Sequence, residues 1–201
     1  DIIEIEKLKT ILSKFSVKCK EKNIKFFPIF YHERLSYPNV LEWFELEKKY
    51  DGTGKAFEPF NTTGVSLAYR KNWKEILTSM KKHGTKRLWL SFHGVGEVHD
   101  KIVNRKGAYK DTLLAIKRAN KFGIKSGCNV FVTKQLINQI DEFIEEMDRL
   151  QIEEMNWGTA EYYPYERHRK YENIRPEIDD LLKIKNKIAQ VDKSETKNNK
   201  W

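Results

Sequence analysis

Polar and titratable side chains in this sequence gather in or directly after short apolar runs. Hydroxyl, imidazole, carboxylate, amide and guanidinium groups can bind a polar ligand, hold a metal or move a proton. The candidates of this kind are Tyr31, His32, Glu33, Thr63, Ser91, His93, Arg105 and Asn129. Folding does not require polar residues at these positions, so their recurrence predicts a shared site, although strand-end polar groups also cap the helices that follow.

The elements that must position these residues alternate between two types. Apolar and β-branched runs predict strands over residues 24–30, 57–60, 87–92, 128–132 and 154–159. Three- and four-residue apolar spacing predicts helices over residues 5–19, 38–47, 73–80, 107–120, 136–150 and 178–188. Strands that alternate with helices are typically parallel and joined by right-handed crossovers. Their carboxyl ends then share one edge, where we expect the candidate residues to meet.

The predicted fold is therefore an α/β domain with a parallel sheet, over residues 1–190, followed by a basic flexible tail over 191–201. Such a sheet either closes as a barrel or opens as a doubly wound sheet. Five strands are too few for a complete eight-stranded barrel. No Gly-rich phosphate-binding sequence follows the first run, which disfavours an open nucleotide-binding sheet.

Composition narrows the classes of protein further. The chain has 201 residues, 39% of them hydrophobic, and a net charge of +9. We expect a soluble, cytoplasmic protein because no apolar run approaches the ~18 residues that a membrane span needs and no secretory leader is visible. The basic residues are scattered between acids and form no strip with interleaved aromatic residues, so nucleic acid is not the expected partner. Two cysteines exclude a disulfide scaffold and favour a reducing compartment.

Three stretches together resemble the radical S-adenosylmethionine (radical SAM) enzymes. Residues 90–94 (LSFHG), with the His-Asp pair at 99–100 and residues 105–109 (RKGAY), are similar to that family's fourth-strand region. Residues 27–35 (FPIFYHERL) are similar to its second strand with the Gly-Gly-Glu-Pro signature. Residues 61–67 (NTTGVSL) resemble its third-strand Thr-Asn-Gly segment, and the order and spacing of all three agree over about residues 1–160.

The resemblance implies a partial TIM-like (βα) barrel with six strands, of which five are visible in the sequence. It implies two cofactors, S-adenosylmethionine (SAM) and a [4Fe–4S] cluster, that together produce a 5′-deoxyadenosyl radical for hydrogen abstraction. By position, Tyr31, His32 and Glu33 would lie beside the methionyl group, with Thr63 and His93 at neighbouring strand ends. Ser91 would bind the ligand's polar edge, Arg105 its carboxylate and Asn129 the ribose hydroxyls. The implied partners are a small-molecule or peptide substrate and a reductant protein.

The sequence departs from this family's pattern in two ways. Tyr31 and His32 replace two glycines of the signature, and Arg34 replaces its proline. The CxxxCxxC loop that holds the cluster is absent, and it would precede the helix that begins near Ile5. Either this loop lies upstream of Asp1 or the protein is a degenerate member. In both cases we expect residues 1–201 alone to lack radical chemistry.

Two alternatives to the radical SAM function involve the same residues. His32, Glu33, His93, His99 and Asp100 could ligate a divalent metal at a barrel mouth, as in metal-dependent hydrolases or isomerases. The third class is a degenerate barrel that binds SAM, a peptide or a protein without turnover.

Overall fold

The computed structural model describes residues 3–28, 33–152, 154–159 and 169–191. In chain order the elements are α1 (Ile5–Glu21), η1 (Arg34–Ser36), α2 (Val40–Tyr50), β1 (Phe60–Thr62), α3 (Val65–Tyr69), α4 (Trp73–Lys82), β2 (Arg87–Phe92), α5 (Glu97–Ile102), α6 (Ala108–Lys121), β3 (Lys125–Val132), α7 (Lys134–Ile137), α8 (Ile140–Arg149), β4 (Glu154–Thr159), α9 (Arg169–Glu172) and α10 (Ile178–Val191). Among these helices none is long and apolar enough to cross a membrane.

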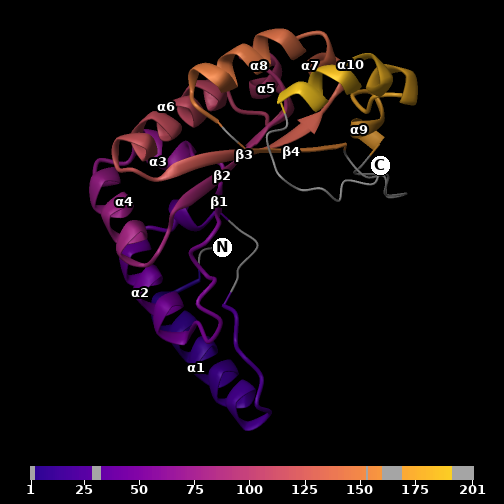
Figure 1. Cartoon of the computed structure of the whole chain (residues 1–201). Coiled ribbons are helices and arrows are strands. Elements are labelled where there is room, and N and C mark those ends of the chain that lie inside the picture. Colours follow the sequence, from indigo (N-terminus) through magenta and orange to yellow (C-terminus); the bar gives the residue numbers. More distant parts are fainter. Residues whose placement is uncertain (1–2, 29–32, 153, 160–168, 192–201) are drawn as a thin grey trace.

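The four strands form one parallel sheet in the order β1-β2-β3-β4. Each strand lies beside the next strand in the sequence, as right-handed βα units dictate. Helices α2, α4, α3, α6 and α8 follow one another along the outer side of this curved sheet, which leaves its inner side concave (Figure 1). The expected α/β architecture with parallel strands is confirmed, and its open arc has the form of a partial barrel.

Alternation along the strands separates the two faces of the sheet. In β2 the side chains of Leu88, Leu90 and Phe92 are fully buried under the outer helices. The intervening residues Trp89 and Ser91 are half-buried on the opposite, inner face. The core therefore lies between sheet and helices, and the inner face is left to carry polar groups.

The expected strand over residues 24–30 is wrong for the part that the structure describes. Residues 24–28 form no strand, and residues 29–30 lie outside the described part of the chain. Ile24 is 61% and Phe27 39% exposed, so this run is not buried on both faces. The Phe26 carbonyl accepts a hydrogen bond from the amide of Gly52 in the loop after α2, 2.8 Å long. An apolar run becomes a strand only where a neighbouring edge supplies a ladder, and here the partner is a loop.

Two other boundaries differ from the sequence prediction. The strand expected over residues 57–60 begins at Phe60, because Phe57 packs its ring into the core beside Phe44, 5.3 Å between centroids. The helix expected over 136–150 is divided into α7 and α8 at Gln139. The side chain of Gln139 accepts the amide of Val95, 3.1 Å away, so the break brings this amide oxygen to the loop after β2.

Candidate functional site

The inner face of the sheet has an aromatic floor toward the amino-terminal edge of its strands. The indole of Trp89 lies across Gly127 of β3, where an added Cβ would come within 3.3 Å of the indole carbons. Below it an ion pair of 2.7 Å joins Arg87 of β2 to Glu154 of β4 across the intervening strand. The indole and the ion pair thus mark the amino-terminal limit of the inner face.

Above this floor a row of polar side chains crosses three strands. Ser91, Asn129 and Asn156 occupy the same register position in β2, β3 and β4. The Asn156 amide donates to the Asn129 carbonyl oxygen over 3.3 Å. Ser91 and Asn129 are half-buried and Asn156 is exposed, so hydroxyl and amide groups stay available to a ligand on the concave side. We call these three residues the polar row.

The next level, at the carboxyl ends of the strands, is a stacked pair of rings. The His93 imidazole lies parallel to the Phe131 ring, with centroids 4.8 Å apart and planes at 11°. Its backbone is held on both sides, because the amide donates to Nδ1 of His99 over 3.3 Å and the carbonyl accepts the Thr133 hydroxyl over 3.2 Å. Burial lowers the pKa of His93, so a neutral imidazole borders the polar row.

Behind this pair, His99 and Asp100 serve the backbone. His99 is 4% exposed and packs against the rings of Phe92 and Tyr109. Burial, and then the neighbouring His93, lower the pKa of His99 to about 4. The two carboxylate oxygens of Asp100 accept the amides of Gly107 and Tyr109 at the start of α6, at 2.5 and 2.8 Å. These hydrogen bonds lower the pKa of Asp100 against the opposing effect of burial, which is the largest single influence.

At the end of β1, Glu33 ties the preceding segment to the strand. One carboxylate oxygen accepts the Thr62 hydroxyl at 2.8 Å and the Leu35 amide at 3.3 Å, and the other accepts the Thr63 amide at 2.6 Å. The Thr62 hydroxyl in turn accepts the amide of Gly64, 3.0 Å away. Glu33 thus fixes the strand end next to the polar row, with its oxygens already occupied by protein donors.

The next residue, Arg34, is buried, and nothing in the sequence pattern marked it. It is 5% exposed, pairs with the buried Glu47 at 3.2 Å and donates to the Ala56 carbonyl at 2.8 Å. Its guanidinium lies 3.7 Å from the centre of the Phe60 ring. Burial raises the pKa of Glu47 although Arg34 opposes the shift. Arg34 is therefore a structural anchor of the segment that carries Glu33.

The structure brings together some of the predicted site residues. Ser91 and Asn129 share the polar row, His93 lies one level above it, and Glu33 and Thr63 meet at the end of β1. Arg105 has its guanidinium in an ion pair with Asp111 of α6, 2.5 Å long, and its role in binding a carboxylate stays a prediction. Tyr31 and His32 lie outside the described residues. The sequence analysis did not include Asn156 among the site residues. Its position in β4, which corresponds to that of Asn129 in β3, is a signal that could have identified it.

Neither the cysteines nor the other ligating residues form a metal centre in the described part of the chain. Those residues contain no group of three or more His, Cys, Asp or Glu placed to hold a metal ion. Cys19 is half-buried on α1, whereas Cys128 is fully buried under the outer helices, where desolvation raises the pKa of its thiol. A [4Fe–4S] cluster needs several thiolates around it. Two separated cysteines do not fit that group.

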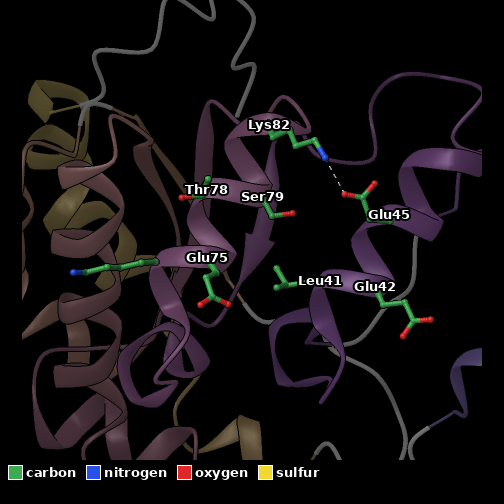
Figure 2. A pocket seen from close by; sticks show the side chains of 8 residues that line it. Leu41, Glu42, Glu45, Glu75, Thr78, Ser79 and Lys82 are labelled. Atoms are coloured by element: carbon green, nitrogen blue, oxygen red, sulfur yellow. Dashed lines mark hydrogen bonds and ion pairs between the residues drawn. The ribbon is translucent and has the colours of Figure 1, made fainter.

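The outer helical layer has a hollow of its own, away from the polar row. It lies between α2 and α4, with a volume of about 550 Å³, and Leu41 points into it (Figure 2). Three carboxylates and two lysines line it, and a Glu45–Lys82 ion pair of 3.2 Å spans its rim. Strand-end residues do not line this hollow, so it is not the candidate site.

Comparison with known proteins agrees with the resemblance. No curated protein matches the chain. A solved structure of histidine-tagged anSMEcpe "with bound AdoMet" is similar at 13% identity and a TM-score of 0.43, over 62% of this chain and 35% of that one. This chain thus spans about a third of the length of that solved chain. The family model of the Radical SAM superfamily matches residues 5–150, well over half of the sequence. The chain therefore belongs to the radical SAM superfamily.

Proposed function

We propose that this chain is the SAM-binding core of a radical SAM enzyme and that it binds SAM along the polar row on the inner face. The observation that carries the proposal is the alignment of Ser91, Asn129 and Asn156 at one register position on the concave side of the sheet. Ligands of parallel α/β sheets bind toward the carboxyl ends of the strands, where the His93–Phe131 pair lies, and the row faces the concave side one level below that pair. When SAM is bound and a reductant delivers an electron, SAM supplies the radical chemistry of the family.

The residues of the site match the chemistry of this ligand. The Ser91 hydroxyl and the Asn129 amide supply both donors and acceptors, as the ribose hydroxyls and the methionyl group require. The Trp89 indole and the Phe131 ring border the row below and above and offer apolar surface to a ligand. Glu33 holds the end of β1 beside the row, and because a carboxylate can accept about four hydrogen bonds, its three protein donors leave it able to accept one from the ligand.

Titration calorimetry with SAM and with S-adenosylhomocysteine tests the binding site. Ser91→Ala and Asn129→Ala should each weaken binding of both compounds about fivefold, the equivalent of one hydrogen bond. Ser79→Ala, in the outer hollow, is the matched control and should leave the affinity unchanged. Unchanged affinity in both row variants, with intact circular dichroism, would place the SAM site elsewhere.

The substrate, a small molecule or a peptide, and the reductant protein are further parts of the proposal, as is a cytoplasmic location. The metal-dependent hydrolase alternative loses support from the geometry. Both Asp100 oxygens are occupied by backbone amides, and Nδ1 of His99 accepts the His93 amide. Among the described residues, these groups also belong to no cluster of three or more side chains placed to hold a metal ion.

A second candidate is a barrel that binds SAM without turnover. The placement of Cys19 and Cys128 is the observation behind it, because the two thiols lie on separate elements and cannot by themselves hold the cluster that turnover requires. Both candidates predict binding along the polar row. They differ in turnover, which chromatographic detection of 5′-deoxyadenosine in the presence of dithionite measures directly.

A further inference from the structure

A basic groove lies on the outer surface, on the helical side of the sheet that faces away from the polar row. It runs between the carboxyl-terminal parts of α6 and α8 and has a volume of about 530 Å³. These helix ends lead into the first residues of β3 and β4, so the groove is at the amino-terminal edge of the sheet. Its main lining residues are Trp73, Leu114, Lys117, Arg118, Lys121 and Arg149. We call it the α6–α8 groove.

The charge of this groove is of one sign. Four of its lining residues are cationic, and none of those that the structure describes there is acidic. Lys117 and Lys121 are exposed, stand one helical turn apart and have no ion-pair partner among the described residues. Like charges at this spacing repel each other and destabilise the helix. The hollow between α2 and α4 differs, because three carboxylates there balance its lysines.

The two arginines of the groove already have partners within the chain. Arg118 donates to the carbonyls of Leu67 and Ala68 and lies 4.5 Å from the centre of the Trp73 ring. Arg149 pairs with Glu146 of its own helix at 2.9 Å. The two lysines are therefore the charges left to receive a partner.

The floor of the groove is apolar. Leu114 is 38% exposed on α6, one turn before the two lysines begin. Arg118 and Lys74 lie over the Trp73 ring and Phe122 meets it edge-on at 5.7 Å, so cations of the chain already compete for the ring on which a nucleic-acid base would stack. Single-stranded nucleic acids need open aromatic faces for stacking. An aliphatic floor beside two lysines instead suits a helix whose carboxylates flank an aliphatic side chain.

We propose that the α6–α8 groove docks an acidic helical segment of a protein partner. Carboxylates one turn apart on that segment would pair with Lys117 and Lys121, and an aliphatic side chain between them would cover Leu114. Because the groove lies on the outer helices and the polar row on the inner face of the sheet, the partner can stay bound while the inner face holds its ligand. This docking does not depend on the function proposed for the inner face.

The test is fluorescence anisotropy with a labelled helical peptide in which glutamates one turn apart flank a leucine. Lys117→Glu combined with Lys121→Glu should weaken binding about tenfold or more, because two attractions become repulsions. The matched control combines Lys7→Glu with Lys14→Glu. Both lysines are exposed on α1, far from the groove, and the two substitutions change the net charge by the same amount. This control should bind the peptide within about twofold of the unaltered chain, after allowance for the smaller long-range attraction.

Three results would overturn the proposal. The first is equal loss of peptide binding in both double variants, since the effect would then follow net charge alone. The second is that the chain binds a labelled single-stranded oligonucleotide more tightly than the peptide and that the groove variant loses this binding. That result would assign the groove to nucleic acid. The third is concentration-dependent association in analytical ultracentrifugation that the groove variant abolishes, which would identify a second copy of this chain as the occupant.

Discussion

At the scale of single residues, the contacts of Glu33 show how one carboxylate fixes a strand end. It accepts three protein donors, and one of them, the Thr62 hydroxyl, is buried. Glu33→Ala should lower the free energy of unfolding by about 1–3 kcal/mol, because it leaves donors without a partner. Glu33→Gln keeps one acceptor oxygen and should lose less. Urea denaturation measures both, with Glu145→Ala on the exposed side of α8 as the control that should change little.

His99 predicts a dependence of stability on pH. The unfolded chain takes up its proton near the ordinary pKa of 6.5, whereas the folded chain does so only near a pKa of about 4. Between these values the unfolded state binds more protons, so stability rises as the pH increases from 4 to 6.5. The contribution of this one residue amounts to about 3 kcal/mol at most.

His99→Asn tests that contribution, because the Asn side-chain oxygen can accept the His93 amide in place of Nδ1. The free energy of unfolding of this variant should change less across the same pH range, as followed by urea denaturation. His93 and His83 also have lowered pKa values and leave a residual slope. A slope as steep as that of the unaltered chain would show that His99 is not the titrating group.

At the scale of elements, the turn between β1 and α3 depends on a glycine. Gly64 has φ of +78°, and an added Cβ would lie 2.8 Å from Leu90 and 2.9 Å from Ala115. Gly107, before α6, has φ of +82° but nothing within 4 Å of an added Cβ. The two positions thus share the same backbone conformation and differ in the space around it.

Alanine substitutions at Gly64 and Gly107 separate the cost of backbone strain from the cost of steric overlap between the added Cβ and its neighbours. Gly107→Ala should lower the free energy of unfolding by about 1 kcal/mol, the cost of a left-handed conformation. Gly64→Ala should cost about 1–3 kcal/mol more, because the β2 and α6 side chains must also move. Thermal and urea unfolding measure the difference. Equal losses would mean that the core around Leu90 relaxes without penalty.

The same scale shows what the sequence could predict about elements. β2 and β4 have the expected bounds, and in β2 the alternating apolar residues are flanked by the polar Lys86 and His93. The run over residues 24–30 was misleading, since an apolar pattern does not report whether a neighbouring edge is available. The division between α7 and α8 was missed because the apolar spacing continues through it, while the Gln139 contact that accompanies it is tertiary.

At the scale of the whole molecule, parallel order and a shared strand-end edge could be predicted from alternation alone. That rule also brought Ser91 and Asn129 to one position, because each faces inward by the two-residue period of its strand. It could not place Arg105, whose ion pair with Asp111 depends on the path of a loop. Nor could it reveal that His99 and Asp100 serve the backbone, since both lie in the short helix α5, which the apolar spacing did not predict.

The placement of the two cysteines governs the last prediction. Cys19 lies on α1, at one end of the arc, and Cys128 lies in β3, on the side covered by the outer helices (Figure 1). A cluster of the radical SAM type needs three thiolates in one loop, as the family's CxxxCxxC implies. A buried thiol with a raised pKa behaves as a small apolar group and is a poor ligand.

Anaerobic reconstitution of residues 1–201 with iron and sulfide should therefore give no stable brown chromophore, and dithionite should yield no 5′-deoxyadenosine from added SAM. The control is calorimetric binding of SAM by the same preparation, which shows that the inner face is intact. Cys19→Ala and Cys128→Ala should leave the absorption spectrum unchanged. If the chain does acquire iron and sulfide in fixed proportion, and one of these variants abolishes it, a thiolate other than those of the family's loop holds the cluster. The inference from thiol position and burial would then be wrong.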